Sequence, residues 1–532
     1  MSSSPTKKAG SNSNAAARSQ VLMAAGIMSI TTVISRLLGL VRVAVITAAF
    51  GADTVEANAI AIASRLPDAL FFIMAGGALA SAFLPTFSAY FAHDDESGGW
   101  RLFSAVTNLI TLVMVVVAGL TALFAPAIIT FYVGDLIERQ SDFLAMTVPL
   151  MRVMLLTPII FGISGVFMAA LNARQHFLLP ALAAILYNVG IILGIILLAP
   201  NVMGMGIGTV LGALAHLLVQ LPGLRQQKAR YTPILTLRDK GVQQVLKLMA
   251  PRVLGLSFSQ LNHLIVPFLA QGMILGSIPA LNYAWLIVNM PLGMIGQALG
   301  IAAFPTLATL AAQAAYEPMR RILADSIRLI IFLAFPATVL LAVLSRPITA
   351  FLFERGAFDA TATTLVADAL FFYILGLTAM AIIEVLSRAF YALGDTTTPV
   401  LAGAGQMVAM VLLCLWLSQQ VFPGLGWPDF GGLALGISLA NWVEVGILGW
   451  WLNKKMKGMD AAAILDGMWR MGFASLIMAL LTWFMGKQLE SWAFLWQLLI
   501  ASSVGGIAYL LLCFLLGVHE IKQFWHYARR RF

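Results

Sequence analysis

An arginine recurs inside long apolar runs, where a charged side chain is costly. Arg36 lies in the string SRLLGL at residues 35–40, and Arg252 lies in the similar string PRVLGL at residues 251–256. A guanidinium at membrane depth costs roughly 2.5 to 3.5 kcal/mol on insertion scales, so it normally faces a polar interior and not lipid. Two copies therefore indicate a duplicated membrane protein with a cationic cavity.

The composition excludes most soluble classes. Of 532 residues, 60% are hydrophobic and 10% are charged, which leaves too little polar surface to coat a soluble fold. The net charge of +9 is explained first by Lys and Arg in cytoplasmic loops, and not by nucleic-acid binding. Cys414 and Cys513 both lie within apolar runs, so they indicate no disulfide framework.

Apolar windows long enough to cross a bilayer recur along the whole chain. We therefore predict an all-α polytopic membrane protein with about 14 transmembrane helices. The expected spans are 21–50, 57–92, 103–133, 143–172, 177–199, 204–223, 243–273, 276–313, 319–345, 361–394, 398–420, 431–453, 468–487 and 492–517.

The distribution of Lys and Arg predicts the orientation. If the N-terminus is cytoplasmic, the outer loops hold only Arg139, Arg346, Arg355 and Lys487 of the 32 Lys and Arg residues. Most of the others then fall in inner loops and tails, as the positive-inside rule requires. We expect a multi-pass protein with both termini in the cytoplasm.

Sequence similarity between the two halves predicts the domain organisation. The stretch 78–86 corresponds to 298–306, and 171–180 corresponds to 390–399, each about 220 residues later and in unchanged order. This predicts two parallel six-helix lobes plus a C-terminal helix pair. The expected parts are a disordered cytoplasmic tail (1–20), an N-lobe (21–223), a cytoplasmic linker (224–242), a C-lobe (243–453), helices 13 and 14 (454–517) and a basic cytoplasmic tail (518–532).

Two parallel halves are a common transporter plan, in which the halves rock about a site at their interface. Glycines and prolines within the spans would allow bends in each half. Examples are Gly39, Gly76, Gly77, Pro85, Gly255, Pro291 and Pro305.

Charged residues inside the spans are the candidate site residues. Arg36, Arg42, Arg252 and Arg65 are the candidates for substrate binding, although Arg65 could instead pair with Asp68. Arginine in a wet vestibule suits a multiply charged anion, because its forked donors match phosphate oxygens. Structural ion pairs between helices are the alternative role.

Two acidic residues are candidates for a coupling ion, Glu384 and Glu444. Glu384 lies one helical turn from Arg388 and could be neutralised by it, whereas Glu444 has no local partner. Arg152 and Arg328 lie toward expected helix ends, where we interpret them as snorkelling to the interface. No nucleotide-binding loop and no His or Cys spacing typical of metal sites occurs, so we expect no cofactor, no metal and no catalytic residue.

Several strings resemble the MurJ/MviN lipid II flippase family of the multidrug/oligosaccharidyl-lipid/polysaccharide exporter superfamily. The series runs in order across most of the chain, and the most specific string is FYALGDT at 390–396. The other strings are SRLLGLVR (35–42), FGA (50–52), RLP (65–67), AFLP (82–85), LN (171–172), FP (304–305), RG (355–356) and TP (398–399). The predicted helix number and the additional C-terminal pair also fit that family.

The resemblance implies a transporter and not an enzyme. It implies that an undecaprenyl-pyrophosphate-linked disaccharide pentapeptide moves from the inner to the outer leaflet of the bacterial cytoplasmic membrane for peptidoglycan biosynthesis, cell wall biogenesis and cell shape. In such proteins the headgroup enters a cationic central cavity and the tail lies in a groove involving the last two helices. Arg36 and Arg42 match the family motif position by position.

The chain also departs from the family pattern. Charges typical of the family are replaced by uncharged residues at Val43, Asn58, Phe71 or Phe72, Gly76 and Leu286. We therefore expect a less charged cavity, in which Arg252 acts as a compensating cation.

Other functions stay open on sequence grounds. A flippase for another polyprenyl-pyrophosphate-linked glycan would need the same cationic cavity. A polytopic glycosyltransferase would need catalytic carboxylates on a sizeable outer loop, which the short outer loops do not offer, and a scaffold would not need the arginines. A proton, sodium or the membrane potential could each drive transport.

Overall fold

The computed structural model describes residues 31, 33–75, 78–140, 142–456 and 458–521. The expected tail 1–20, the start of the first span, Gly76, Gly77 and residues 522–532 of the basic tail lie outside these residues. The described part of the chain is helical and contains no strand. The all-α fold class is therefore confirmed.

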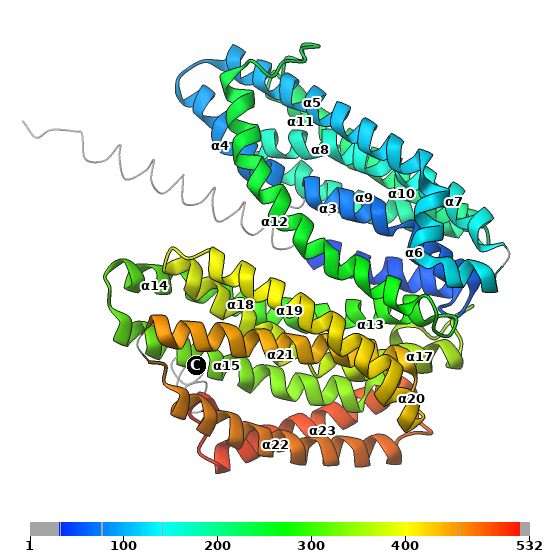
Figure 1. The fold of residues 1–532 in the computed structure, drawn as a ribbon, viewed down its shortest axis with the longest axis vertical. Helices are drawn as coiled ribbons and strands as arrows, with labels where there is room; N and C mark the ends of the chain where they lie inside the picture. The colour runs from blue at the N-terminus through cyan, green and yellow to red at the C-terminus, as the bar shows by residue number, and fades with distance from the viewer. Residues whose placement is uncertain (1–30, 32, 76–77, 141, 457, 522–532) are drawn as a thin grey trace, which may run out of the picture. The chain divides into compact units, whose positions relative to one another are not determined.

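The chain forms two compact units, Met1–Phe268 and Leu269–Phe532 (Figure 1). The first unit begins with the helix Val33–Phe50. Its further helices are α2 (Val55–Ala63), α3 (Arg65–Ala75), α4 (Ala78–Ala92), α5 (Glu96–Leu123), α6 (Ala125–Arg139), α7 (Phe143–Met154), α8 (Leu156–Ala173), α9 (Leu178–Leu198), α10 (Met203–Leu218), α11 (Leu221–Gln226) and most of α12 (Lys240–Ala270).

The second unit contains the remaining helices, including two short π-helical segments, η1 and η2. The elements are α13 (Ser277–Leu292), η1 (Gly293–Gln297), α14 (Ala298–Ala312), α15 (Tyr316–Val343), α16 (Ser345–Phe353), α17 (Ala360–Ile374), α18 (Leu377–Ala392), α19 (Thr397–Trp416), η2 (Leu417–Val421), α20 (Phe422–Leu425), α21 (Asp429–Lys455), α22 (Ala461–Gln488) and α23 (Phe494–Leu515).

Most of the expected spans are helices of membrane-spanning length. Eleven helices among the described residues are long and apolar enough to cross a membrane, or up to twelve if each bent pair is one span. The bent pair is α17 and α18, which meet at 44°. The two other expected spans coincide with the interrupted series α2–α4 and with α12.

Of the three prolines expected to bend helices, only Pro291 lies next to a change of helix type. Pro291 lies in the last turn of α13, immediately before η1, where the hydrogen-bond pattern widens. In contrast, α4 continues through Pro85 and α14 continues through Pro305. Membrane helices tolerate such prolines because neighbouring groups satisfy the freed carbonyls.

Glycines bring neighbouring helices into backbone contact in both units. In the first unit, a Cβ added to Gly194 of α9 would lie 2.4 Å from Cα of Gly208 in α10. In the second unit, a Cβ added to Gly432 of α21 would lie 2.7 Å from the backbone nitrogen of Ser418 in η2. Close approach of small residues replaces the hydrophobic effect as the source of helix association in lipid. These contacts fix the last two helices of each expected lobe.

An aromatic core orders the first unit around α4, α5 and α8. Phe87 contacts Trp100 edge-on at 5.5 Å, and Trp100 contacts Phe103 in the same way. Val242 and Val245, near the start of α12, are fully buried in this cluster. The N-terminal part of α12 thus packs within the first unit.

Candidate functional site

Three charged side chains of the first unit interact electrostatically. Arg42 comes from the helix Val33–Phe50, and Arg65 and Asp68 come from the first turn of α3. Both arginines lie within electrostatic range of the Asp68 carboxylate. Asp68 is exposed to solvent in the structure. Two cations and one anion leave a net charge of +1. The structure thus brings Arg42 and Arg65, two of the predicted substrate-binding residues, to one carboxylate.

An aromatic ring forms one wall beside Arg42. The guanidinium carbon lies 6.0 Å from the centroid of the Tyr187 ring, a cation–π distance. Nε of Arg42 is buried and has no hydrogen-bond partner among the described residues. A charged group with one buried, unsatisfied donor is suited to an additional acceptor, because leaving that donor unsatisfied costs free energy.

A polar network behind the ring holds Tyr187 in place. The ring contacts Phe161 of α8 edge-on at 5.0 Å, and Phe161 contacts the His216 ring at 5.1 Å. Ser164 Oγ lies 2.6 Å from His216 Nδ1, and Gln220 Nε2 donates to Ser164 Oγ at 2.7 Å. Satisfied buried networks of this kind rigidify the helices that carry them. Tyr187 and this network were not predicted as site elements.

Arg36 and Arg252 lie at exposed positions of the first unit. Neither forms an ion pair with a residue that the structure describes. Asn188 of α9 donates to the carbonyl of Ser35 at 3.5 Å, which places α9 beside the helix turn that carries Arg36. No contact in the structure places either arginine with Arg42.

Arg65 also borders an apolar cavity of about 340 Å³ in the first unit. Tyr132 of α6 lies in the same wall and donates from its hydroxyl to the carbonyl of Leu264 in α12 at 2.5 Å. The other lining residues are Ile62, Leu66, Ile128, Ile129, Phe131, Met151, Ile265 and Phe268. The cationic residue Arg65 thus lies beside a cavity with mainly apolar walls.

The two candidate acids of the second unit differ in their surroundings. Glu384 forms an ion pair with Arg388 on the next turn of α18, as the spacing allowed. The Arg388 guanidinium packs against Gly300 of α14, where an added Cβ would lie 2.6 Å from its Nη1. Glu444 of α21 is half-buried and forms no ion pair with a described residue. Tyr391 lies within electrostatic range of all three charges.

The string at 390–396 forms a helix joint. Asp395 Oδ1 accepts from the backbone nitrogens of Thr397 and Thr398 at 3.1 and 3.0 Å, which caps the start of α19. Its Oδ2 also lies 2.6 Å from Nζ of Lys455, at the end of α21. These contacts lower the pKa of the Asp395 carboxyl below its usual range. The aspartate of this string thus binds two helix ends.

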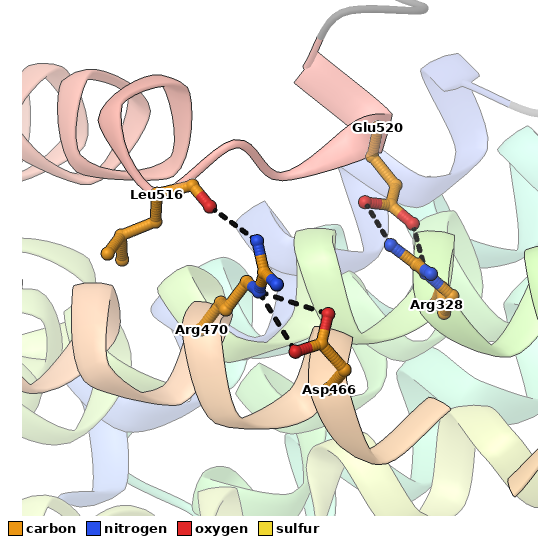
Figure 2. A network of polar contacts seen from close by, with 5 residues as sticks. All are labelled: Arg328, Asp466, Arg470, Leu516 and Glu520. Carbon is orange, nitrogen blue, oxygen red and sulfur yellow. Dashed lines mark hydrogen bonds and ion pairs between the residues drawn. The ribbon is translucent and has the colours of Figure 1, made fainter. Parts of the chain in front are cut away.

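A second polar network fastens the C-terminal helices to α15 (Figure 2). Arg328 of α15 binds Glu520 through Nε at 2.6 Å and Nη2 at 3.2 Å. Arg470 of α22 binds Asp466 and donates from Nη1 to the carbonyl of Leu516, which ends α23. Arg328, one of the two arginines interpreted as snorkelling, therefore has a carboxylate partner 192 residues away.

The described residues contain no group of three or more His, Cys, Asp or Glu side chains that could hold a metal ion. The arrangement offers fixed cations next to aromatic and apolar walls. It can therefore bind an amphiphilic anion, and it offers no arrangement of side chains typical of covalent catalysis.

Comparison with known proteins finds similarity to lipid II flippases. The family model described as lipid II flippase MurJ matches residues 46–503. The lipid II flippase MurJ of Burkholderia cenocepacia is 30% identical over 417 residues, covering 77% of this chain and 79% of that protein. A probable lipid II flippase MurJ of Buchnera aphidicola is 25% identical over 510 residues, covering 94% of this chain and 98% of that protein.

Solved structures share the fold. A structure of lipid II flippase MurJ in an inward closed conformation matches with a TM-score of 0.73 and 24% identity, over 91% of this chain and 97% of that one. An inward-facing multidrug resistance MATE transporter matches with a TM-score of 0.66 and 15% identity, over 82% of this chain and 98% of that one. The helical fold is therefore shared with a flippase and with a multidrug transporter. With most of its length matched by the family model, the chain belongs to the lipid II flippase MurJ family.

Proposed function

We propose that this chain flips lipid II, the undecaprenyl-pyrophosphate-linked peptidoglycan precursor, from the inner to the outer leaflet by alternating access. The observation that carries the proposal is Arg42 beside Tyr187, with a buried Nε that has no hydrogen-bond partner among the described residues, in a chain of the MurJ family. The two or more negative charges of a pyrophosphate need fixed cations when they leave water.

Each residue of the cluster has a distinct role in this proposal. Arg42 offers an unsatisfied donor to a phosphate oxygen, and Tyr187 limits the positions of its guanidinium. Asp68 reduces the repulsion between Arg42 and Arg65 in the absence of substrate. Arg36 and Arg252 add cations at exposed positions of the same unit. The polyprenyl tail needs no polar contact and stays among apolar side chains.

Transport needs no covalent step, and the driving force is a separate question. Glu384 is neutralised by Arg388, whereas Glu444 has no ion partner among the described residues. We therefore favour Glu444 over Glu384 as the residue that binds a coupling ion. The membrane potential is the alternative, since moving one charge across 100 mV is worth about 2.3 kcal/mol.

Family membership and the apolar helices make the chain a bacterial inner membrane protein. We propose that both termini lie in the cytoplasm, because this leaves few Lys and Arg residues in the outer loops. The division into an N-lobe (21–223), a linker (224–242), a C-lobe (243–453) and a C-terminal pair (454–517) belongs to the same proposal.

The test is replacement of the resident lipid II flippase in a conditional bacterial strain, with lipid II in the outer leaflet as the measured quantity. The wild-type chain is expected to restore export, and Arg36→Ala/Arg42→Ala is expected to lose it at equal protein level. Arg152→Ala is the matched control, because Arg152 is an exposed arginine bonded only to the Ala122 carbonyl among the described residues.

No export by a correctly inserted wild-type chain would contradict the lipid II assignment. Export of a different polyprenyl-pyrophosphate glycan in the same strain would then identify the alternative substrate. Equal export by the wild type and the double variant would contradict the role of the arginines.

A further inference from the structure

A second cavity lies in the second unit, and none of the candidate site residues lines it. It has a volume of about 320 Å³ and is formed where α15 and α16 meet the turn between α22 and α23. The lining residues are Val343, Leu344, Arg346, Pro347, Glu354, Trp483, Gly486, Lys487, Glu490, Phe494 and Gln497. The wall thus combines charged and apolar side chains.

The charges of this cavity are balanced but not paired with one another. Two cations, Arg346 and Lys487, and two acids, Glu354 and Glu490, line it. No ion pair joins any two of the four, all of which are described residues. Glu354 accepts a hydrogen bond from Thr363 Oγ1 at 2.8 Å, which leaves its other oxygen unused. Arg346 also lies within electrostatic range of Asp368, and both kinds of charge line the cavity.

Aromatic residues place this cavity at the level of lipid headgroups. Trp483, Trp492 and Trp496 are 52%, 52% and 55% exposed at this end of α22 and α23. Exposed tryptophans collect at the interface between hydrocarbon and water, where the ring is amphipathic. Nζ of Lys487 lies 4.8 Å from the centroid of the Trp483 ring, which holds the cation at that depth.

We propose that this cavity binds the headgroup of a zwitterionic phospholipid that carries a primary ammonium group. The phosphate contacts Arg346 and Lys487, and the ammonium contacts Glu354 and Glu490. The acyl chains leave along Trp483 and Phe494 into the bilayer. The bound lipid would be a resident lipid of the C-terminal helix pair, and the proposal rests on the membrane location and not on the transported substrate.

The lining chemistry favours this headgroup over its relatives. Two cations and two acids sum to zero charge, which matches a zwitterion better than an anionic lipid. A primary ammonium donates three hydrogen bonds to carboxylates, whereas a trimethylammonium group donates none. An ethanolamine headgroup can therefore satisfy both acids, and a choline headgroup cannot.

The experiment is native mass spectrometry of the full chain with phosphatidylethanolamine, phosphatidylglycerol or phosphatidylcholine of identical acyl chains, and with glycerophosphoethanolamine alone. We expect the wild type to bind phosphatidylethanolamine most tightly. Arg346→Gln and Glu490→Gln should each weaken that binding about tenfold, as expected for one lost charge-assisted contact. Arg346→Lys should retain most of it, and thermal unfolding of each variant verifies its fold.

Glu138→Gln is the matched control, because Glu138 is an exposed glutamate of α6 in the other unit. Its binding of phosphatidylethanolamine should equal that of the wild type. Tighter binding of phosphatidylglycerol, or unchanged binding in Arg346→Gln and Glu490→Gln, would overturn the proposal. Equally tight binding of glycerophosphoethanolamine would also overturn it, because the ligand would then be a soluble phosphoamine and not a lipid.

Discussion

Two arginines of the first unit, Arg42 and Arg65, act on one carboxylate, whereas Arg388 in the second unit has a carboxylate on its own helix. Arg42 and Arg65 both act on Asp68, while Arg388 pairs with Glu384 on the same helix. An unmatched cation carries charge that an anionic ligand can neutralise. A matched cation has already lost that capacity, so its role is to hold helices together.

This difference separates two kinds of experimental outcome. Removing one member of a buried pair leaves a charge without compensation and costs stability. Removing an unmatched cation relieves repulsion in the free protein and costs ligand binding instead. Variants of paired and of unpaired charges should therefore affect different measured quantities, namely the free energy of unfolding and the rate of lipid export.

The largest effect on stability is expected for Glu520→Gln. Its carboxylate binds Arg328 in a bidentate manner, and the two side chains are 8% and 17% exposed. The substitution should lower the free energy of unfolding by about 3 kcal/mol. The measurement is chemical unfolding in detergent, with Asp466→Asn as the control, because Asp466 and Arg470 form a more exposed pair. Equal losses in both variants would show that burial does not decide the cost.

The largest effect on transport is expected for Arg42→Gln. Loss of one charge-assisted contact to the pyrophosphate should lower lipid II flipping about tenfold or more. The free energy of unfolding should change little, because Arg42 shares Asp68 with Arg65. Flipping in proteoliposomes measures the effect, and Arg152→Gln is the matched arginine control. Similar losses in the two variants would indicate a general effect of positive charge.

A smaller effect distinguishes the two acids of the second unit. Glu444→Gln should lower flipping about fivefold, since about 1 kcal/mol of ion coupling would be lost. The double variant Glu384→Gln/Arg388→Gln should stay within about twofold of the wild type, because it removes a neutral pair. Flipping rates at a fixed ion gradient compare them. A larger loss in the double variant would transfer the coupling role to Glu384.

The fold class could be predicted from the sequence. Long apolar windows indicate membrane helices, and similar strings about 220 residues apart indicate a duplication. The close contact of α9 and α10 could also have been predicted, since Gly204, Gly208 and Gly212 repeat every four residues. The pairing of Arg328 with Glu520 could not, because it joins residues 192 positions apart. Tyr187 was missed for a similar reason: only the rotation of α9 directs one tyrosine toward Arg42.

The smallest expected effect concerns the joint at Asp395. Asp395→Asn preserves the cap of α19 and removes the ion pair with Lys455. The side chain of Asp395 is 18% exposed and that of Lys455 is 40% exposed. The folded protein holds the pKa of Asp395 below its usual range, so the pair stabilises the fold at neutral pH. That contribution is lost as the pH falls below the usual carboxyl pKa of about 3.9 toward the lowered value in the folded state. The difference in free energy of unfolding between wild type and Asp395→Asn should therefore be below about 1 kcal/mol at pH 7 and smaller at pH 3.

Chemical unfolding at the two pH values measures this difference. A difference that grows on acidification would mean that Asp395 is protonated in the folded protein, and the joint would then depend on its backbone contacts and not on the charge of Lys455.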